Sequence, residues 1–190
     1  MLPSSESEYQ EGIKSLSRYQ ARLSDPSQKS ALFYARADNL NNWLGDVGTR
    51  LGSLSQRLSA SVGRVKLNTA LKTEVVAPGQ VPQVDEEIVE TPWMQIDNVF
   101  YEARGQAWAL SHLLRAIEVD FADVLAKKNA TVSVRQIIRE LEASQEPVWS
   151  PMILNGSGFG VLANHSLVMA NYISRANAAV IDLRQLLNQG

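Results

Sequence analysis

Apolar residues recur at alternating spacings of four and three along three long stretches of this 190-residue chain. The positions in the first stretch are Leu40, Leu44, Val47, Leu51, Leu54 and Leu58. Those in the second are Ile96, Phe100, Ala103, Ala107, Leu110, Leu114, Ile117, Phe121 and Val124. Those in the third are Leu162, Met169, Ile173, Ala176, Val180, Leu183 and Leu187. Such spacing lines one face of a helix with apolar side chains, which must then be buried against other helices. The sequence therefore predicts an all-α fold, an antiparallel helical bundle with three long heptad-bearing helices and two short helices.

One of the two short helices is predicted before the three long stretches and the other between the second and the third. Residues 6–24 place Ile13, Leu16, Tyr19 and Leu23 on one face, and Asp25-Pro26 then marks the start of a new helix. Ser133 and Gln136 form a capping-box pattern before the inward positions Val134, Ile137, Ile138 and Leu141. Prolines and acidic residues at 77–91 predict an irregular linker. We expect one helical-bundle domain over residues 1–190 that contains this linker.

Small residues form a second stripe beside the first apolar seam. Its members are Asn41, Gly45, Gly48, Gly52, Ser55 and Ser59. Glycine inside a helix costs about 0.5–1 kcal/mol relative to alanine, so a close approach by a neighbouring helix is the favoured interpretation. The alternative is that Gly45 or Gly48 interrupts the helix.

Composition excludes several classes of function. The chain has no cysteine, which rules out disulfides, thiolate metal sites and cysteine nucleophiles. The formal net charge of −2 gives no reason to expect nucleic acid as a partner. Neither His112 nor His165 follows a glutamate by three positions, so the carboxylate-bridged metal pattern of helical bundles is absent. We expect no catalytic residue, no metal site and no cofactor, and His112 is predicted at the edge of the core, bonded to a backbone carbonyl.

An arginine stripe flanks the first seam at Arg36, Arg50, Arg57 and Arg64. Residues in such flanking positions form ion pairs between helices, and we expect Arg50, Arg57 or Arg64 to pair with Asp97, Glu118 or Asp120. The alternatives are a solvated basic face and contact with an anionic membrane surface.

A polar region around the start of the last helix is the candidate ligand site. Its residues are Asn155, Gly156, Gly158, Asn164, His165, Asn171 and Arg175. Glycines before a helix can expose backbone N–H groups to an anion, but the residue at 161 is valine where a dinucleotide fingerprint needs glycine. A structural turn and a capped polar network are the competing interpretations.

Whole segments resemble a known family. The stretches Trp93–Leu110, Ser150–Gly160 and Asn164–Asn177 resemble a family of uncharacterised bacterial proteins, domain of unknown function 2333. The resemblance implies an N-terminal membrane anchor ahead of this region and supplies no catalytic residues. If an anchor has been removed, the domain is expected on the periplasmic side of the inner membrane; otherwise it is expected in the cytoplasm.

These observations lead to three expectations of function. The first is a helical interaction or scaffold domain of a membrane-tethered bacterial envelope protein, with a protein partner. The second is a ligand-binding protein or enzyme that uses the Asn155–Arg175 region. The third is peripheral binding of anionic lipid through the arginine stripe.

Overall fold

The computed structural model describes residues 5–25, 33–67, 86–157 and 159–189. These residues belong to two compact units, Met1–Ala35 and Arg36–Gly190. The first unit contains the first helix and the second contains the helical bundle, and the single domain expected over residues 1–190 stays a prediction. Each unit is therefore described by itself.

The first unit contains helix α1, Glu6–Ser24, with the bounds that the sequence predicted. Its apolar face carries Ile13, Leu16, Tyr19 and Leu23, and all four side chains are exposed. No residue of α1 is buried. The helix is thus amphipathic by sequence without a buried face of its own.

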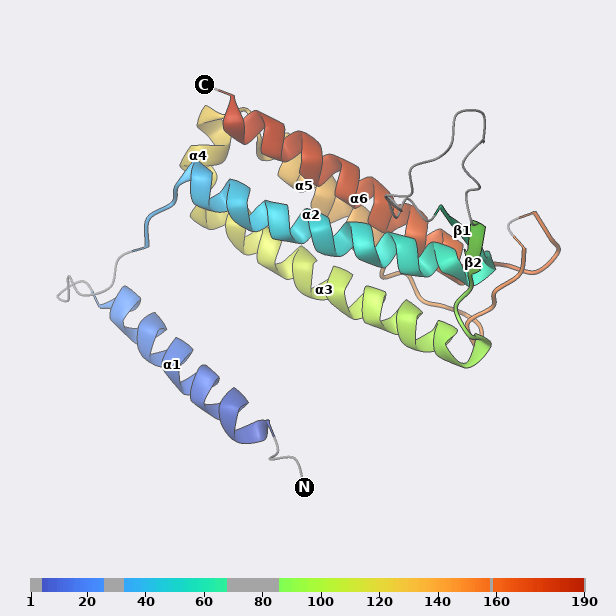
Figure 1. The fold of residues 1–190 in the computed structure, drawn as a ribbon. Helices are drawn as coiled ribbons and strands as arrows, with labels where there is room; N and C mark the ends of the chain where they lie inside the picture. The colour runs from blue at the N-terminus through green and yellow to red at the C-terminus, as the bar shows by residue number, and fades with distance from the viewer. Residues whose placement is uncertain (1–4, 26–32, 68–85, 158, 190) are drawn as a thin grey trace, which may run out of the picture. The chain divides into compact units, whose positions relative to one another are not determined.

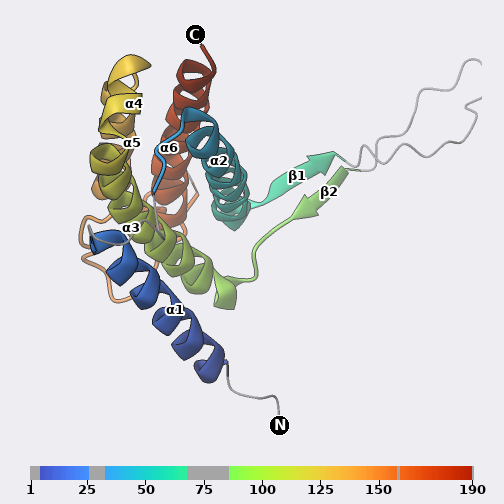
Figure 2. The same ribbon diagram turned by 90° about the vertical axis from the view of Figure 1, so that its left-hand side faces the viewer.

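The second unit is a bundle of four main helices: α2 (Ala37–Ser59), α3 (Ile96–Asp120), α5 (Thr131–Ala143) and α6 (His165–Asn188). Figure 1 shows α2 and α5 running one way and α3 and α6 the other. Helix α6 packs most extensively against α2 and then against α5, and α3 packs against α5 and α2. Figure 2 shows α6 between α2 and α5. The predicted all-α, antiparallel bundle is confirmed.

The core of the bundle comes from the predicted seams, with one shift of phase. All six seam residues of α2 are buried, and so are those of α6 from Met169 onward. The second seam is interrupted at Phe121, where α3 ends and the short helix α4 (Ala122–Lys127) begins. Leu125 is fully buried there instead of the predicted Val124. The prediction of an uninterrupted seam to Val124 was wrong because the turn at Phe121 rotates the next face inward.

The start of α5 differs from the predicted capping. Helix α5 begins at Thr131 with Ala130 as its N-cap and no side-chain cap, so the predicted capping box at Ser133 is not formed. Its predicted inward residues Val134, Ile137, Ile138 and Leu141 are nevertheless buried. At the end of α4, Asn129 adopts a positive φ of 52°, the left-handed conformation that asparagine tolerates after a helix.

A short two-stranded sheet stands between α2 and α3. Strands β1 (Arg64–Leu67) and β2 (Glu86–Val89) pair antiparallel, with Arg64 opposite Val89 and Leu67 opposite Glu86. The single turns η1 (Ala60–Val62) and η2 (Trp93–Gln95) connect them to the helices. Residues 86–89 were predicted irregular, and their strand is a correction: adjacent Ile88 and Val89 favour extended backbone. The predicted residues 77–85 of the linker lie outside the described residues.

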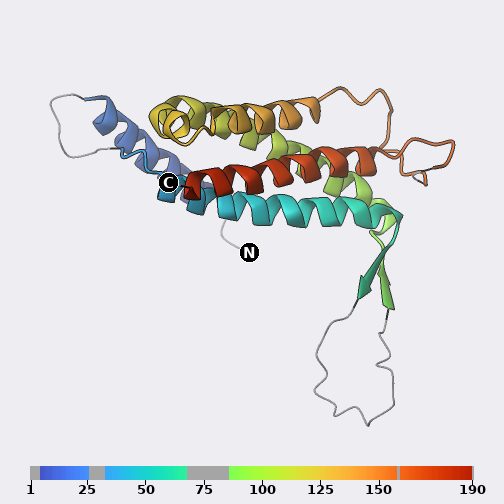
Figure 3. The same ribbon diagram turned by 90° about the horizontal axis from the view of Figure 1, so that it is seen from above.

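The sheet leaves the bundle beside the end of α2 and the start of α3, as Figure 3 shows. Helix α5 also ends at this end of the bundle, and α6 begins there. We call this the loop end of the bundle. The segment that connects α5 to α6, residues 144–164, also lies there because it joins the end of one helix to the start of the other.

The small-residue stripe of α2 lies against α6. Helix α2 is continuous, so the glycines do not interrupt it. A Cβ atom built on Gly48 would lie 3.5 Å from Oδ1 of Asn177, and one on Gly45 would lie 3.3 Å from the Arg184 guanidinium. Nε of Arg184 also donates to Oδ1 of Asn41 at 3.1 Å. Side chains of α6 therefore come close to the glycines, which is the close approach of a neighbouring helix that the stripe predicted.

Candidate functional site

Exposed apolar side chains gather on the segment between α5 and α6. Trp149 is 94% exposed, and Phe159 and Val161 are fully exposed. Met152 and Leu162 on the same segment are exposed by more than half. We call these five side chains the apolar tip. Single exposed apolar residues are ordinary, but a group of them marks an interaction surface.

The sequence around the apolar tip carries no charge. Between Pro147 and Ser174 there is no Asp, Glu, Lys or Arg. Depletion of charged residues with enrichment in aromatic residues and methionine distinguishes the centre of protein interfaces from ordinary surface. This part of the loop end therefore combines both compositional signs of an interface.

A cavity of about 210 Å³ opens beside the apolar tip. Its walls come from α3 through Phe100 and Arg104, from the end of α5, and from the first turns of α6. The apolar lining includes Val148, Trp149, Val168, Met169 and Tyr172. Met169 is unbranched and adapts to irregular shapes, which suits a pocket for a large apolar side chain.

Two polar groups in the cavity wall are held by backbone atoms. The Arg104 guanidinium donates to the carbonyl of Glu146 at 2.9 Å and to that of Gln145 at 2.5 Å. These carbonyls follow the last turn of α5, where a positive charge is favourable. Nδ1 of His165 accepts the Leu154 N–H at 3.0 Å, so the neutral ring carries its proton on Nε2. Both side chains therefore have fixed orientations in the wall.

Three residues of the predicted ligand site instead close the loop. Asn155 and Asn164 form an isolated antiparallel bridge, and Nδ2 of Asn164 donates to the carbonyl of Gly156. Oδ1 of Asn164 accepts the N–H of Leu167 at 2.8 Å and caps α6. Nδ2 of Asn155 donates to the carbonyl of Ser61, which ties the loop to the end of α2. This network holds the apolar tip in place.

The backbone donors expected to cradle an anion are occupied by protein acceptors. The N–H of Gly156 donates to Ala163, that of Gly160 to Ser157 and that of His165 to Leu154. A Cβ atom on Gly156 would clash with the Leu162 carbonyl oxygen, which explains the glycine. The geometry favours the structural turn; Gly158 lies outside the described residues.

Asn171 and Arg175 lie apart from this network. Both are exposed on α6, and Arg175 pairs with Glu140 of α5 at 2.8 Å while its guanidinium stacks 4.9 Å from the Tyr172 ring centre. Of the predicted set, the structure thus brings together Asn155, Gly156, Asn164 and His165, and of these only His165 lines the cavity.

A family model matches the whole chain. The model described as "Uncharacterized protein conserved in bacteria (DUF2333)" matches residues 1–190. The chain belongs to the DUF2333 family. Neither the curated proteins nor the solved structures gave a match to it.

The described part of the DUF2333 chain shows neither a membrane-spanning helix nor a cluster of metal ligands. Among the described residues, no helix is long and apolar enough to cross a membrane. The same residues contain no group of three histidine, aspartate or glutamate side chains able to hold a metal ion.

The arginine stripe of the DUF2333 chain is partly neutralised within the bundle. Arg57 forms a two-bonded ion pair with Glu102 of α3, at 2.8 and 2.6 Å, and these bonds hold the pKa of the Glu102 carboxyl below its usual value. Arg36 pairs with Asp38, and Arg50 is exposed. The side chain of Arg64 lies outside the description. Arg57 thus forms an ion pair between two helices, as predicted, but its partner is Glu102 and none of the predicted acids Asp97, Glu118 and Asp120.

The register of the antiparallel helices explains that error. Arg57 lies near the loop end of α2 and therefore meets the first turns of α3. Glu118 lies sixteen residues beyond Glu102, about 24 Å further along the helix. It pairs with Arg135 of α5 instead.

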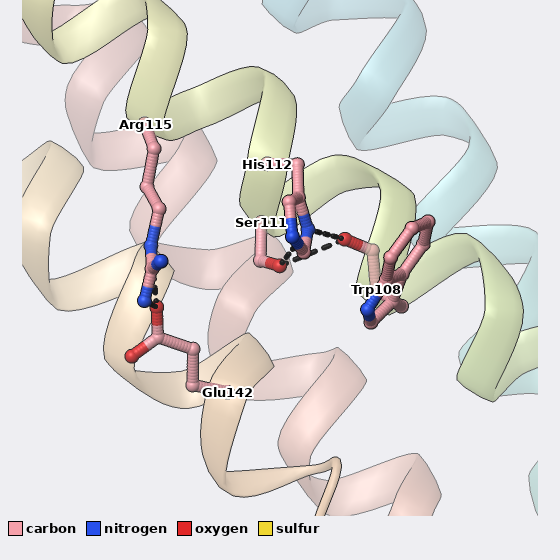
Figure 4. A network of polar contacts seen from close by, with 5 residues as sticks. All are labelled: Trp108, Ser111, His112, Arg115 and Glu142. Atoms are coloured by element: carbon pink, nitrogen blue, oxygen red, sulfur yellow. Dashed lines mark hydrogen bonds and ion pairs between the residues drawn. The ribbon is translucent and has the colours of Figure 1, made fainter.

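Histidine 112 lies against a backbone carbonyl, as the sequence predicted, but the residue is exposed and does not lie at the edge of the core. Its Nδ1 atom lies 2.9 Å from the Trp108 carbonyl on the outer side of α3, and its ring lies 4.4 Å from the Trp108 ring (Figure 4). Ser111 also donates to the Trp108 carbonyl, and Arg115 reaches Glu142 of α5. Of these contacts, the Arg115–Glu142 ion pair joins α3 to α5.

The apolar tip and the cavity were missed at the level of sequence. The signal that could have found the tip is the run without charge from Pro147 to Ser174, which is unusually long for a chain with 20% charged residues. The cavity had no such signal, because its wall combines residues from three helices that are distant in sequence.

Proposed function

We propose that the chain is a helical interaction domain that binds a protein partner at its loop end. The observation that carries this proposal is the apolar tip, whose five side chains are all more than half exposed on a segment without charge that is held by hydrogen bonds at its base. Exposing such side chains to water is unfavourable, and covering them with a partner recovers about 25 cal/mol per Å² of apolar surface.

The construction of the loop end supports an interaction role. A surface on a pre-ordered loop loses less conformational freedom on binding than a flexible one. The Asn155–Asn164 bridge and the cap on α6 supply that order. The cavity beside the tip offers a place for one anchoring side chain, as interface hot spots commonly require.

A small-molecule ligand in the same cavity is the second candidate. His165 supports it, because its Nε2–H is a donor in a wall that is otherwise largely apolar. Lipid binding through the arginine stripe ranks third, because Arg36 and Arg57 are each paired with an acid.

The membrane tether is a separate part of the proposal. It rests on the family resemblance, which implies an anchor ahead of the domain and a location on the periplasmic side of the inner membrane. Fusion of the full-length bacterial protein to alkaline phosphatase, which folds actively only outside the cytoplasm, tests that location; an inactive fusion that is well expressed would refute it.

Photo-crosslinking in cells tests the interaction role. A photoreactive phenylalanine analogue at Trp149 or Phe159 is expected to give a discrete protein adduct, and the same analogue at Ile181 is the control. Ile181 is exposed on α6 well beyond the residues of that helix that line the cavity. Absence of adducts from the tip, or equal adducts from Ile181, would refute a binding surface at the loop end.

A further inference from the structure

We infer that the side of α3 opposite its buried seam is a self-association surface, on which α3 of a second copy of this chain packs antiparallel. We call this side the outer face of α3; it shares no residue with the apolar tip. Its positions are Tyr101, Gly105, Trp108, His112, Arg115 and Val119, with Ala109, Leu113 and Ala116 beside them. All of these residues are exposed, whereas the seam on the other side of the helix is buried.

The outer face carries large apolar side chains along the length of α3. Tyr101 and Trp108 are each 57% exposed, and Leu113 and Val119 are exposed by more than half. From residue 103 to residue 114 the only Asp, Glu, Lys or Arg is Arg104, whose guanidinium is held by backbone carbonyls. The alternating four-three spacing from Tyr101 to Val119 is that of a helix seam. Helix α3 therefore has two seams, and the described residues cover only one of them.

Gly105 is a separate sign that another helix approaches this face. Glycine inside a helix is less favourable than alanine. The described part of the chain gives no reason for it, because a Cβ atom on Gly105 would meet nothing within 4 Å. The glycines of α2 differ in this respect, since a Cβ atom on Gly48 would contact α6. A side chain from a second helix, packed over Gly105, supplies the missing reason.

The spacing along the outer face fits an antiparallel pair of identical helices. It reads the same from either end, and its centre is level with Leu110. A two-fold axis at this level therefore matches the face to itself, as a symmetric dimer requires. Tyr101 then lies level with Val119 of the second copy, and Trp108 lies level with His112. The Trp108 and His112 rings already stack 4.4 Å apart (Figure 4), so the axis brings two such stacks together.

Charge complementarity favours the antiparallel pair over a parallel one. Arg115 lies level with Gly105 of the second copy, where there is room for its side chain, and Glu102 lies one turn before that glycine. Glu142 engages only Nε and Nη2 of Arg115, so among the described residues Nη1 has no hydrogen bond. The Glu102 side chain is paired with Arg57 but stays 42% exposed, and a carboxylate accepts several bonds. A parallel pair would instead place each charge beside its like.

One helix from each copy makes a small interface. Tyr101 and Val119 are eighteen residues apart, about 27 Å along the helix. Such a contact falls in the class below about 1,200 Å², whose members associate weakly, so the dimer is expected to be reversible. Because each α3 begins at the loop end, the pair directs its two loop ends in opposite directions. A dimer that binds two partners rests on the proposed function, whereas the pairing itself does not.

Sedimentation velocity of the full chain tests the pairing. The sedimentation coefficient is expected to rise from that of a monomer to that of a dimer over about a hundredfold range of concentration. Trp108→Asp and Gly105→Leu are each expected to weaken dimerisation at least about tenfold. Space around Gly105 is open within one copy, so this variant keeps the fold, which circular dichroism checks. Ile181→Asp, at an exposed apolar residue of α6, is the control and is expected to dimerise as the original chain does.

Introduced cysteines test the register, because the chain has none of its own. Ala109 is the exposed position nearest the axis, so Ala109→Cys is expected to form a disulfide-linked dimer on mild oxidation. Tyr101→Cys and Val119→Cys are expected to crosslink to each other when mixed. Neither is expected to crosslink to itself, because two copies of either residue lie about 27 Å apart along the paired helices.

Each contrary outcome overturns a stated part of the inference. A chain that stays monomeric throughout the concentration range refutes self-association. Dimerisation that survives both Trp108→Asp and Gly105→Leu places the contact elsewhere and refutes the outer face. Crosslinking of Tyr101→Cys to itself refutes the antiparallel register in favour of a parallel pair. None of these results depends on photo-crosslinks from Trp149, so the proposed function stands or fails separately.

Discussion

Replacing Gly48 by leucine tests whether the stripe on α2 holds α6 at close range. A Cβ atom at this position already contacts Oδ1 of Asn177 at 3.5 Å and Cγ1 of Val180 at 3.7 Å. Both distances are ordinary contacts, so alanine fits. The three further carbon atoms of leucine have to displace Asn177 or Val180. Overpacking of this kind costs about 1–3 kcal/mol.

Gly105 provides the matched control. It lies inside α3, and a Cβ atom there would meet nothing within 4 Å. Replacing a helical glycine stabilises the helix by about 0.5–1 kcal/mol when space is open. Alanine is therefore expected to stabilise at both positions, and leucine only at Gly105.

Urea unfolding followed by helical circular dichroism measures the difference. The free energy of unfolding is expected to be lower by about 1–3 kcal/mol for Gly48→Leu than for Gly105→Leu, because the helix-propensity gain cancels between them. In thermal unfolding, each kcal/mol corresponds to about 2–4 °C for a chain of this size. Equal stability of the two leucine variants would refute the close packing of α2 and α6.

Three further predictions follow from individual contacts. Arg57→Ala and Glu102→Gln in a double-mutant cycle are expected to show a coupling of about 0.2–1 kcal/mol that falls with salt. Because the ion pair lowers the pKa of Glu102, the stabilisation by the pair is present above the unfolded-state pKa and is lost as the pH falls through the lower folded-state pKa. A coupling energy that is unchanged in acid would contradict this ion pair. Asn164→Ala is expected to destabilise by about 0.5–2 kcal/mol, and Asn164→Asp to recover the cap on Leu167 but not the bond to Gly156, so equal effects of the two would argue against the cap. Ile173→Ala is expected to cost about 2–5 kcal/mol in the same unfolding assay, since its side chain is fully buried; a smaller loss would place α6 outside the core.

The parts of the fold that depend on local spacing could be predicted from the sequence. The buried leucines of α2 follow directly from the four-three repeat, because that repeat describes one face of a helix. The same reasoning failed at Phe121, where a turn between α3 and α4 changed the face without any proline or glycine to signal it. Periodicity describes a face only as long as the helix continues.

Contacts between helices depended on information that periodicity does not contain. The pairing of Arg57 with Glu102 is set by the axial register of α2 and α3, and the spacing within each helix leaves that register open. Periodicity also leaves open which of the polar candidate residues lie together. Asn155 and Asn164 come together through a bridge that closes a loop, whereas Asn171 and Arg175 point to solvent and to Glu140.

The arrangement of α2 and α6 has a consequence for synthesis of the protein. These are the first and last helices of the bundle, and their mutual packing is the most extensive in it. A chain that emerges from the ribosome therefore carries most of the apolar face of α2 uncovered until the last helix has been made. Contacts between such distant segments slow folding and prolong the exposure of apolar surface. Nascent chains that stop before Met169 are thus expected to require chaperones, whereas the finished chain closes its own core.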